Sequence, residues 1–280
     1  MTWHAHLHLD YRLQAGRTVV HHQHQGPLRV LQSLYPEGDA ICHNVLVHPP
    51  GGLVGGDTLD IQAQVGPGAH ALITTPGATR FYRSEGPLAL QRTRLTLAAG
   101  ARLEWLPLEA LCYNACHAQN HLTLNLEPGA DLLGWDVTAL GLPGADLPFE
   151  RGQLVQHIEL PGVWLERARI NAADQRLLTS PLGLAGHQCI ASLFWASGSP
   201  FTQGIRREQR EAALQAARDL IAGHELAATS AVTSPNPQVI IVRTLAPLVE
   251  PAMDLLQRIR AAWRHTVWGL PGVKPRIWAM

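Results

Sequence analysis

The chain has 280 residues, of which 46% are hydrophobic and 16% are charged, so it is long enough to fold around one large core. Lysine plus arginine and aspartate plus glutamate each total 22, which excludes the strongly basic surface of a nucleic-acid-binding protein. No run of apolar residues is long enough to span a membrane, and the N-terminus lacks the pattern of a secretory signal. Four cysteines do not make a disulfide framework in a chain of this length, so we expect a cytoplasmic protein.

The first two thirds of the chain have the pattern of strands. Apolar and polar side chains alternate over residues 3–10, 59–65 and 122–126, the period of two that is expected of half-buried strands. The pattern strand, small turn, strand recurs at Gly68, Gly100, Gly129 and Gly162, roughly 30 residues apart. This period fits stacked β-layers of a solenoid, and it fits equally a meander of hairpins with similar turns. Either arrangement gives a mainly β fold.

The last third changes character. Residues 205–222 form an apolar face at helical spacing and end at Gly223, and a second helix is predicted from Pro251 to just before Gly269. Residues 238–244 are predicted to form a buried strand and residues 230–237 a loop. No linker separates two domains, so we expect one domain over 1–280, mostly β layers in 1–200, with helix, strand, helix and tail in 201–280 packed on them.

Residues 48–57 form a glycine-rich loop with the sequence HPPGGLVGGD. No Lys-Ser/Thr pair follows, and the next segment has the period of a strand, whereas a phosphate loop needs a following helix N-terminus. We therefore interpret the loop as a tight crossing between layers where side chains do not fit. Asp57 is expected to accept hydrogen bonds from amides of this loop.

Cys112, Cys116, His117 and His121 have the spacing C-x3-C-H-x3-H, which suits zinc or nickel. On a strand, however, Cys116 and His117 point to opposite faces, so one closed site would require a loop. Buried cysteines and surface histidines are the alternative, and this strand geometry favours them.

Histidines also gather near the N-terminus, and fifteen are present in all. They form two groups, His4, His6 and His8, and His21, His22 and His24. The first group lies on one face of a predicted strand, where loose binding of a soft divalent ion is one interpretation and a solvated face is the favoured one.

Two acidic residues interrupt apolar strands: Asp136 in LLGWDV and Glu166 in VWLER. A buried carboxylate is costly unless it is paired or hydrated, so these acids either point outward or line a hydrated internal passage. The sequence contains no nucleophile elbow, zinc-protease helix or P-loop, and we expect no enzymatic activity.

Several blocks, in order along nearly the whole chain, closely resemble the urease accessory proteins called UreD, or UreH in some bacteria. They are residues 35–37 (YPE), 46–57 (LVHPPGGLVGGD), 72–83 (LITTPGATRFYR), 103–107 (LEWLP), the pair Trp135-Asp136 and 275–278 (PRIW). The residues that carry this family pattern are Pro49, Pro50, Gly51, Gly52, Gly55, Gly56, Asp57, Thr74, Thr75, Tyr82, Arg83, Trp105 and Pro107. The chain departs from relatives at Leu140-Gly141-Leu142, where an arginine often replaces the second leucine, so a charged contact is expected to be missing.

The resemblance implies a right-handed β-helix-like fold of two stacked sheet layers plus two helices. It also implies a non-enzymatic partner of a helical accessory protein, UreF, and through it of a nickel-carrying GTPase, UreG. The assembly is expected to dock on apo-urease and to pass nickel through an internal channel, with Asp136 and Glu166 as its candidate lining. The cysteine–histidine cluster is not part of the family pattern.

A conduit for nickel must bind the ion weakly, and a closed thiolate site would trap it. We therefore expect transient nickel, no tightly bound cofactor, and oxygen ligands at Asp136 and Glu166. The alternative function is a stand-alone nickel-binding or storage protein that uses the Cys/His clusters.

Overall fold

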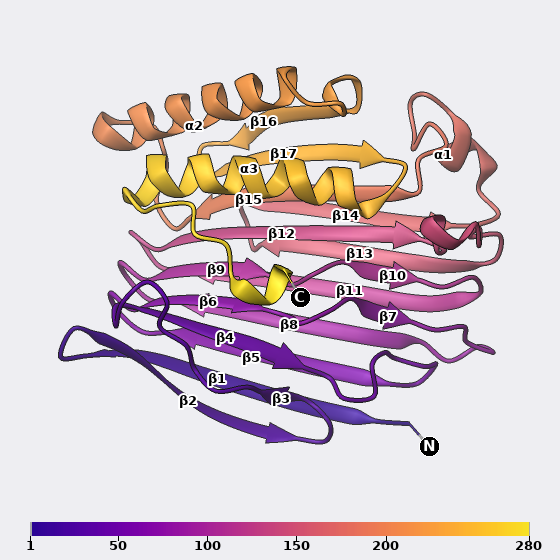
Figure 1. Ribbon diagram of the computed structural model, residues 1–280, viewed down its shortest axis with the longest axis horizontal. Coiled ribbons are helices and arrows are strands. Elements are labelled where there is room, and N and C mark those ends of the chain that lie inside the picture. The colour runs from indigo at the N-terminus through magenta and orange to yellow at the C-terminus, as the bar shows by residue number, and fades with distance from the viewer. Residues whose placement is uncertain (1, 280) are drawn as a thin grey trace.

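The computed structural model describes residues 2–279 as two β-sheets packed face to face, with two long helices on one outer side (Figure 1). Strand makes up 46% of the fold and helix 19%, and the stacked coils resemble a β-solenoid of about four turns. The prediction of a mainly β protein with two stacked layers is therefore confirmed.

The first sheet has seven strands in the order β14-β13-β11-β8-β5-β1-β2. Their bounds are β1 His4–Gln14, β2 Arg17–Gln25, β5 Thr58–Val65, β8 Ala89–Leu97, β11 Cys116–Leu126, β13 Gly152–Leu160 and β14 Trp164–Asn171. The strands β1, β5, β8, β11 and β13 are parallel, and antiparallel β2 and β14 form the two edges. In β1, the predicted alternation places Ala5, Leu7, Leu9 and Tyr11 in the core.

The second sheet has ten strands, eight of them in the order β16-β17-β15-β12-β9-β6-β4-β3, while β10 pairs with β12 and β7. Their bounds are β3 Arg29–Val30, β4 Ile41–Val47, β6 His70–Thr74, β7 Thr79–Phe81, β9 Arg102–Leu106, β10 Ala110–Cys112, β12 Asp131–Leu140, β15 Cys189–Ser197, β16 Ser230–Asn236 and β17 Val239–Ala246. Its central strands β4, β6, β9 and β12 are parallel, and β12, β15, β17 and β16 are antiparallel.

The coils stack because the chain passes repeatedly from the first sheet to the second through the same turn. Gly68, Gly100 and Gly129 occupy these turns with φ of +68°, +69° and +81°, a conformation that residues with a side chain rarely adopt. Gly162 differs from them: it closes the antiparallel hairpin between β13 and β14, within one sheet. The predicted repeat is therefore a solenoid at three of its positions and a hairpin at the fourth.

Three α-helices lie within residues 2–279: α1 Gln175–Thr179, α2 Gly204–Ala222 and α3 Val249–Trp268. Three short 3-10 turns are also present in this range, at Pro143–Ala145, Ala227–Thr229 and Arg276–Ala279. The long helices α2 and α3 agree with the predicted ones, and α3 ends at Gly269, which has a left-handed φ of +66°.

The prediction of a loop over 230–237 is wrong, because residues 230–236 form β16, an edge strand paired with β17. Pro235 lies where the register shifts between Thr233 and Asn236. An edge strand tolerates proline at such a place, because no ladder hydrogen bond is lost there.

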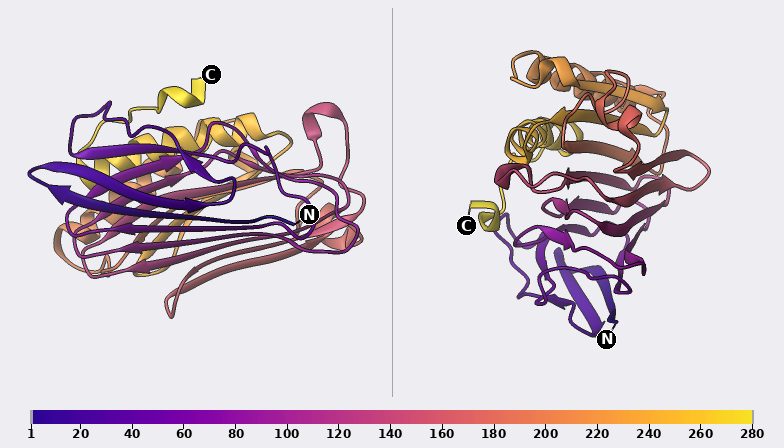
Figure 2. Two further views of the ribbon diagram at one scale, coloured as in Figure 1. Left: turned by 90° about the horizontal axis from the view of Figure 1, so that it is seen from below. Right: turned by 90° about the vertical axis from the view of Figure 1, so that its right-hand side faces the viewer.

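Two hydrophobic cores follow from this architecture. One fills the space between the sheets and includes Leu9, Ile61 and Leu124; the other lies between the second sheet and the two long helices and includes Trp135 and Trp263. Figure 2 shows the coils in succession from the N-terminal to the C-terminal strands, with α3 and the tail alongside one face. The outer face of the first sheet, on the other side, keeps most of its polar side chains at least partly exposed.

Candidate functional site

A row of amide side chains crosses the inner face of the first sheet, in a core that is otherwise mostly apolar. Gln91 on β8, Asn120 on β11 and Gln156 on β13 are paired in register on adjacent parallel strands. Gln91 Nε2 donates to Asn120 Oδ1 at 3.4 Å. Residues directly opposite on neighbouring strands share a face, so the three amides form a continuous polar line between the sheets.

Asp136 meets this amide row from the opposite sheet. In β12 the neighbours Trp135 and Val137 point toward the helices, so Asp136 points toward the first sheet. Asn120 Nδ2 donates to Asp136 Oδ2 at 3.0 Å, and Thr138 Oγ1 donates to Asp136 Oδ1 at 3.2 Å.

Burial shifts the pKa of Asp136. Removal from water raises the pKa of its carboxyl group, and hydrogen bonds from Gln156, Thr138 and Asn120 only partly reverse that rise. The result is a carboxyl group with a raised pKa whose hydrogen-bond donors, Asn120 and Thr138, are uncharged.

A cavity of about 470 Å³ opens beside Asp136 at the C-terminal half of the first sheet. It is lined by Asp136 and Gln156, by Glu166 on β14, by Ser192 on β15 and by Arg243 on β17. The two acids singled out in the sequence therefore face one cavity, although they belong to different sheets.

Glu166 is already held by a partner. Arg243 Nε and Nη2 donate to its two carboxylate oxygens at 2.7 and 2.5 Å, a bidentate arrangement. The Glu166 side chain is 31% exposed and that of Arg243 is 43% exposed. Glu166 can therefore contact an ion in the cavity only if the Arg243 guanidinium turns aside, whereas Asp136 has no cationic partner among its hydrogen bonds within residues 2–279.

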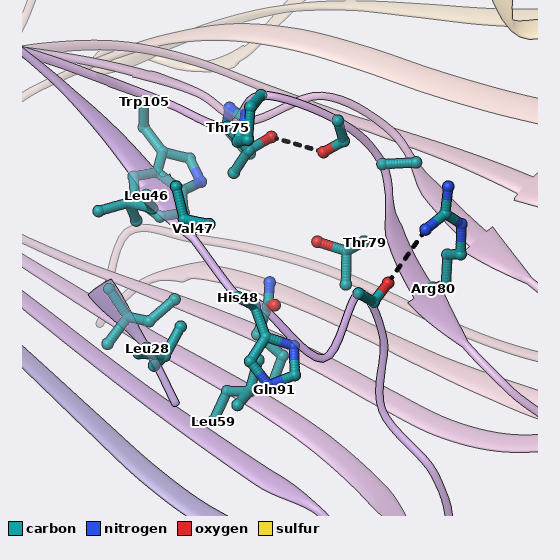
Figure 3. Close-up of a pocket in the computed structure, with 16 residues that line it drawn as sticks. Leu28, Leu46, Val47, His48, Leu59, Thr75, Thr79, Arg80, Gln91 and Trp105 are labelled. Carbon is teal, nitrogen blue, oxygen red and sulfur yellow. Dashed lines mark hydrogen bonds between the residues drawn. The ribbon is translucent and has the colours of Figure 1, made fainter. Parts of the chain in front are cut away.

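A second cavity, of about 240 Å³, lies at the other end of the amide row, between β4, β5 and the turn after β6 (Figure 3). Gln91 lines it, together with His48, Thr75, Trp105 and Pro107 from the sequence blocks noted above. The Nε2 atom of His48 is buried without a hydrogen-bond partner in the described part of the chain, and burial lowers the pKa of this imidazole although Asp57 opposes the shift. The amide row thus leads from one cavity to the other.

The glycine-rich loop is the tight crossing that the sequence predicts. A Cβ atom on Gly52 would lie 2.5 Å from Tyr82 Cε2 and 2.7 Å from the Arg80 carbonyl oxygen. Gly51 and Gly56 have positive φ, and a Cβ on Gly55 would overlap Ser84.

The side chain of Asp57 closes this loop. As expected, it accepts a hydrogen bond from a loop amide, that of Val54 at 2.9 Å, and it also accepts one from the amide of Trp3, outside the loop, at 2.8 Å. Pro49 and Pro50 form the turn that begins the loop.

Thr74 and Thr75, at the end of β6, connect neighbouring coils. Thr74 Oγ1 donates to the Leu106 carbonyl at 2.6 Å and accepts from Trp278 Nε1 at 2.8 Å. Thr75 Oγ1 accepts from the Leu108 amide at 2.9 Å. Both hydroxyls therefore have structural partners.

Aromatic and proline residues of the sequence blocks also have structural partners. Tyr82 packs edge-on against Tyr113 with ring centres 5.0 Å apart, and the Pro107 carbonyl accepts from Trp135 Nε1 at 2.6 Å. The Arg83 side chain is 79% exposed and reaches toward Glu85.

The cysteine–histidine cluster does not converge on one point. Cys112 and Cys116 are buried between the sheets, and contact with Cys116 together with burial raises the pKa of the Cys112 thiol well above its ordinary value. His117 and His121 point the other way from β11: His117 Nδ1 bonds the Gly86 carbonyl at 2.7 Å, and His121 stacks on His157 with ring centres 4.7 Å apart.

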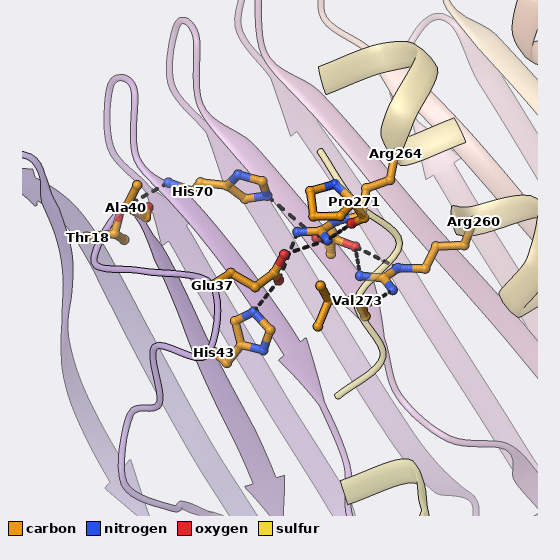
Figure 4. A network of polar contacts seen from close by, with 10 residues as sticks. Thr18, Glu37, Ala40, His43, His70, Arg260, Arg264, Pro271 and Val273 are labelled. Atoms are coloured by element: carbon orange, nitrogen blue, oxygen red, sulfur yellow. Dashed lines mark hydrogen bonds and ion pairs between the residues drawn. The ribbon is translucent and has the colours of Figure 1, made fainter. Parts of the chain in front are cut away.

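A buried ion network, which the sequence patterns do not reveal, joins α3 to the early coils (Figure 4). Glu104 on β9 is fully buried and accepts hydrogen bonds from Arg260 and Arg264. Arg264 also donates to both oxygens of Glu37, at 2.7 and 2.9 Å, and His43 lies 2.9 Å from the same carboxylate. The sequence shows a glutamate inside LEWLP and two arginines four residues apart in the last helix. Nothing in the sequence indicates that these charges contact one another.

Comparison with known proteins bears on these sequence blocks. The family described as "UreD urease accessory protein" matches residues 4–279. Urease accessory protein UreD of Variovorax paradoxus (strain S110) is 65% identical over 279 residues and covers 100% of both chains. The proteins of the same name from Polaromonas sp. (strain JS666 / ATCC BAA-500) and Paracidovorax citrulli (strain AAC00-1) are 64% and 65% identical over 280 residues, again over 100% of both chains. No helix within residues 2–279 combines the length and hydropathy needed to cross a membrane.

The family match over residues 4–279 and the identities of 64–65% over whole chains show that the chain belongs to the UreD family of urease accessory proteins.

Proposed function

We propose that this chain is a non-catalytic scaffold that supports delivery of nickel to apo-urease in the cytoplasm. In this proposal it works with a UreF-type helical protein and, through that protein, with a UreG-type GTPase. Family membership supports the accessory role. The layered fold supports the scaffold role, because stacked coils offer long rigid faces for partner proteins.

The observation that carries the nickel proposal is the polar line formed by Gln91, Asn120, Asp136 and Gln156 between two cavities. Oxygen ligands from a carboxylate, amides and water exchange readily, whereas thiolates hold Ni²⁺ tightly. A route for an ion needs such weak contacts, and Asp136 supplies the charge near the middle of the line. Nickel is the cargo in this proposal, bound transiently.

Urease activation under limiting nickel tests the proposal. Cells that lack the gene are complemented with the wild-type chain, with Asp136→Asn or with Glu166→Gln, and urease activity and nickel content are measured. We expect Asp136→Asn to reduce both several-fold, while pull-down of the UreF-type and UreG-type proteins stays at the wild-type level. If pull-down falls as far as activation does, Asp136 is structural and the passage loses its support.

The alternative function, stand-alone nickel storage at the cysteine and histidine cluster, makes a different prediction. It requires stoichiometric nickel on the isolated chain that disappears in Cys112→Ala or Cys116→Ala. The separation of the buried cysteines from the outward histidines argues against one closed site made by all four side chains.

A further inference from the structure

The outer face of the first sheet carries a group of metal-ligating side chains that neither the amide row nor the buried ion network uses. Parallel pairing sets His6 on β1 opposite Asp60 on β5 and sets His4 opposite Thr58. His4 and His6 are two residues apart, so both imidazoles project from the same face as the Asp60 carboxylate. Within residues 2–279, these three side chains form a group whose potential ligand atoms all lie within 4.8 Å of one another.

The two imidazoles converge on one oxygen of the Asp60 carboxylate. His4 Nε2 lies 2.8 Å from Asp60 Oδ2, and His6 Nδ1 lies 3.8 Å from the same atom. The imidazole centres are 4.1 Å apart. The side chains of His4 and His6 are 58% and 45% exposed, whereas that of Asp60 is only 12% exposed, so the group is anchored at its base and open toward solvent.

Arg92 fixes the carboxylate from the other side. It lies on β8, in register with Asp60, and its Nη1 donates to Asp60 Oδ1 at 3.1 Å. One oxygen is thus held by the guanidinium while the other faces the two histidines, the kind of outer contact that orients a metal ligand. The positive charge of Arg92 also lowers the affinity of the group for a cation, because it partly neutralises Asp60.

We propose that His4, His6 and Asp60 form a surface site for a borderline divalent cation of the Ni²⁺ or Zn²⁺ class. Two imidazole nitrogens and one carboxylate oxygen suit these ions, and three protein ligands leave positions for water or for a donor from another molecule. Such an open site exchanges its ion. The inference is independent of the proposed passage, because His6 and Asp60 lie on the opposite face of the first sheet from Gln91 and Asn120.

The test is titration of the purified full-length chain with NiCl₂ and, separately, with ZnCl₂, by calorimetry or equilibrium dialysis. We expect one equivalent of ion whose affinity falls at least tenfold in His4→Ala/His6→Ala and in Asp60→Asn. The matched control is His22→Ala/His24→Ala, which removes two histidines of the same spacing from the neighbouring strand β2, with ring centres 6.4 Å apart. This control variant should still bind one equivalent of ion with the wild-type affinity.

A spectroscopic readout separates the surface site from the cysteines. X-ray absorption of the nickel-loaded chain should give nitrogen and oxygen ligands, two of them imidazoles, and no sulfur. Wild-type protein that binds no ion, affinity that is unchanged in both site variants, an equal loss in the control or a sulfur-ligated ion would each overturn the proposal. Thermal unfolding of the metal-free variants checks that they fold, and His6→Gln alone supplies a milder change at the same position.

Discussion

Arg260 donates two hydrogen bonds to one oxygen of Glu104, at 2.8 and 2.5 Å, although the two residues are 156 positions apart in the chain. Their side chains are 1% and 0% exposed. Arg260 also donates to the Val273 carbonyl at 2.7 Å, so the same guanidinium holds both the sheet and the C-terminal tail. The pair fixes the last helix onto the second sheet.

Replacing Glu104 by glutamine should destabilise the fold by about 3 kcal/mol, because the buried guanidinium of Arg260 would lose its counter-charge and that of Arg264 would keep only Glu37. The free energy of unfolding in urea is the measurement. Glu85→Gln is the control, since the Glu85 side chain is 90% exposed and its pair with Arg83 is long. Equal stability of Glu104→Gln and wild type would mean that the buried ion network contributes nothing net.

The same network predicts how stability depends on pH. Burial alone would raise the pKa of Glu104, but Arg260, His70 and Arg264 outweigh burial and lower it from 4.5 to about 2. A carboxyl group with a lowered pKa in the folded state contributes stability above its unfolded pKa and loses it as the pH falls through the folded value. We expect melting temperatures to decline between about pH 4.5 and pH 2, and less steeply in Glu104→Gln. Identical slopes in both proteins would contradict this assignment.

Asp136 should show the opposite sign. Burial raises its pKa, so the ionised carboxylate opposes folding, and its contribution to stability is present below the unfolded pKa and lost as the pH rises through the folded one. Asp136→Asn should therefore melt at the same or a higher temperature than wild type at neutral pH, although it activates urease several-fold less. Parallel melting and activation assays measure both effects. A variant that melts well below wild type would indicate a structural role.

Gly56→Val should lower the yield of soluble protein sharply. Gly56 has φ of +95°, and an added Cβ would lie 2.5 Å from Thr2 Cγ2, so valine is strained in backbone and side chain alike. Gly77→Val is the control, because a Cβ added to Gly77 would meet no heavy atom within 4 Å and its φ is not positive. The soluble fraction after expression, measured side by side, is the test, and a soluble and fully active Gly56→Val protein would refute it.

Trp278→Ala should cost about 2 kcal/mol, roughly half the loss for a fully buried tryptophan. Its ring lies 5.0 Å from that of Trp135, and its Nε1 donates to Thr74 Oγ1 at 2.8 Å. Trp3→Ala, at a side chain that is 51% exposed, should cost much less. Denaturant unfolding of the two variants distinguishes a docked C-terminal tail from one that contributes nothing.

The β layers and the long helices could be predicted because they depend on local periodicity. Alternation over residues 3–10 predicted β1, and helical spacing predicted α2 and α3 nearly to the residue. The recurring turn could not by itself distinguish a solenoid from hairpins, since Gly68 and Gly162 have the same left-handed φ. What differs is the strand partner after the turn, and that is a long-range property.

Of the candidate site, only the two acidic residues could be predicted from the sequence. Asp136 and Glu166 stand out as acids within apolar strands, whereas Gln91, Asn120 and Gln156 lie in segments rich in polar residues, where nothing reveals that they face inward. The strand β16 was missed for a related reason. Its small and polar residues are typical of a loop, and only pairing with β17 gives it the strand conformation.

The contact between Glu37 and Arg264 has a consequence for biosynthesis. The two residues are separated by 227 positions, so the ion pair can form only after nearly the whole sequence has left the ribosome. The early strands can pair with one another before then, but α3 cannot yet dock on them, and a fold that depends on such long-range contacts forms slowly and is prone to aggregate. Chains truncated before α3 would lack the ion pair between Glu37 and Arg264 and would be substrates for cellular quality control.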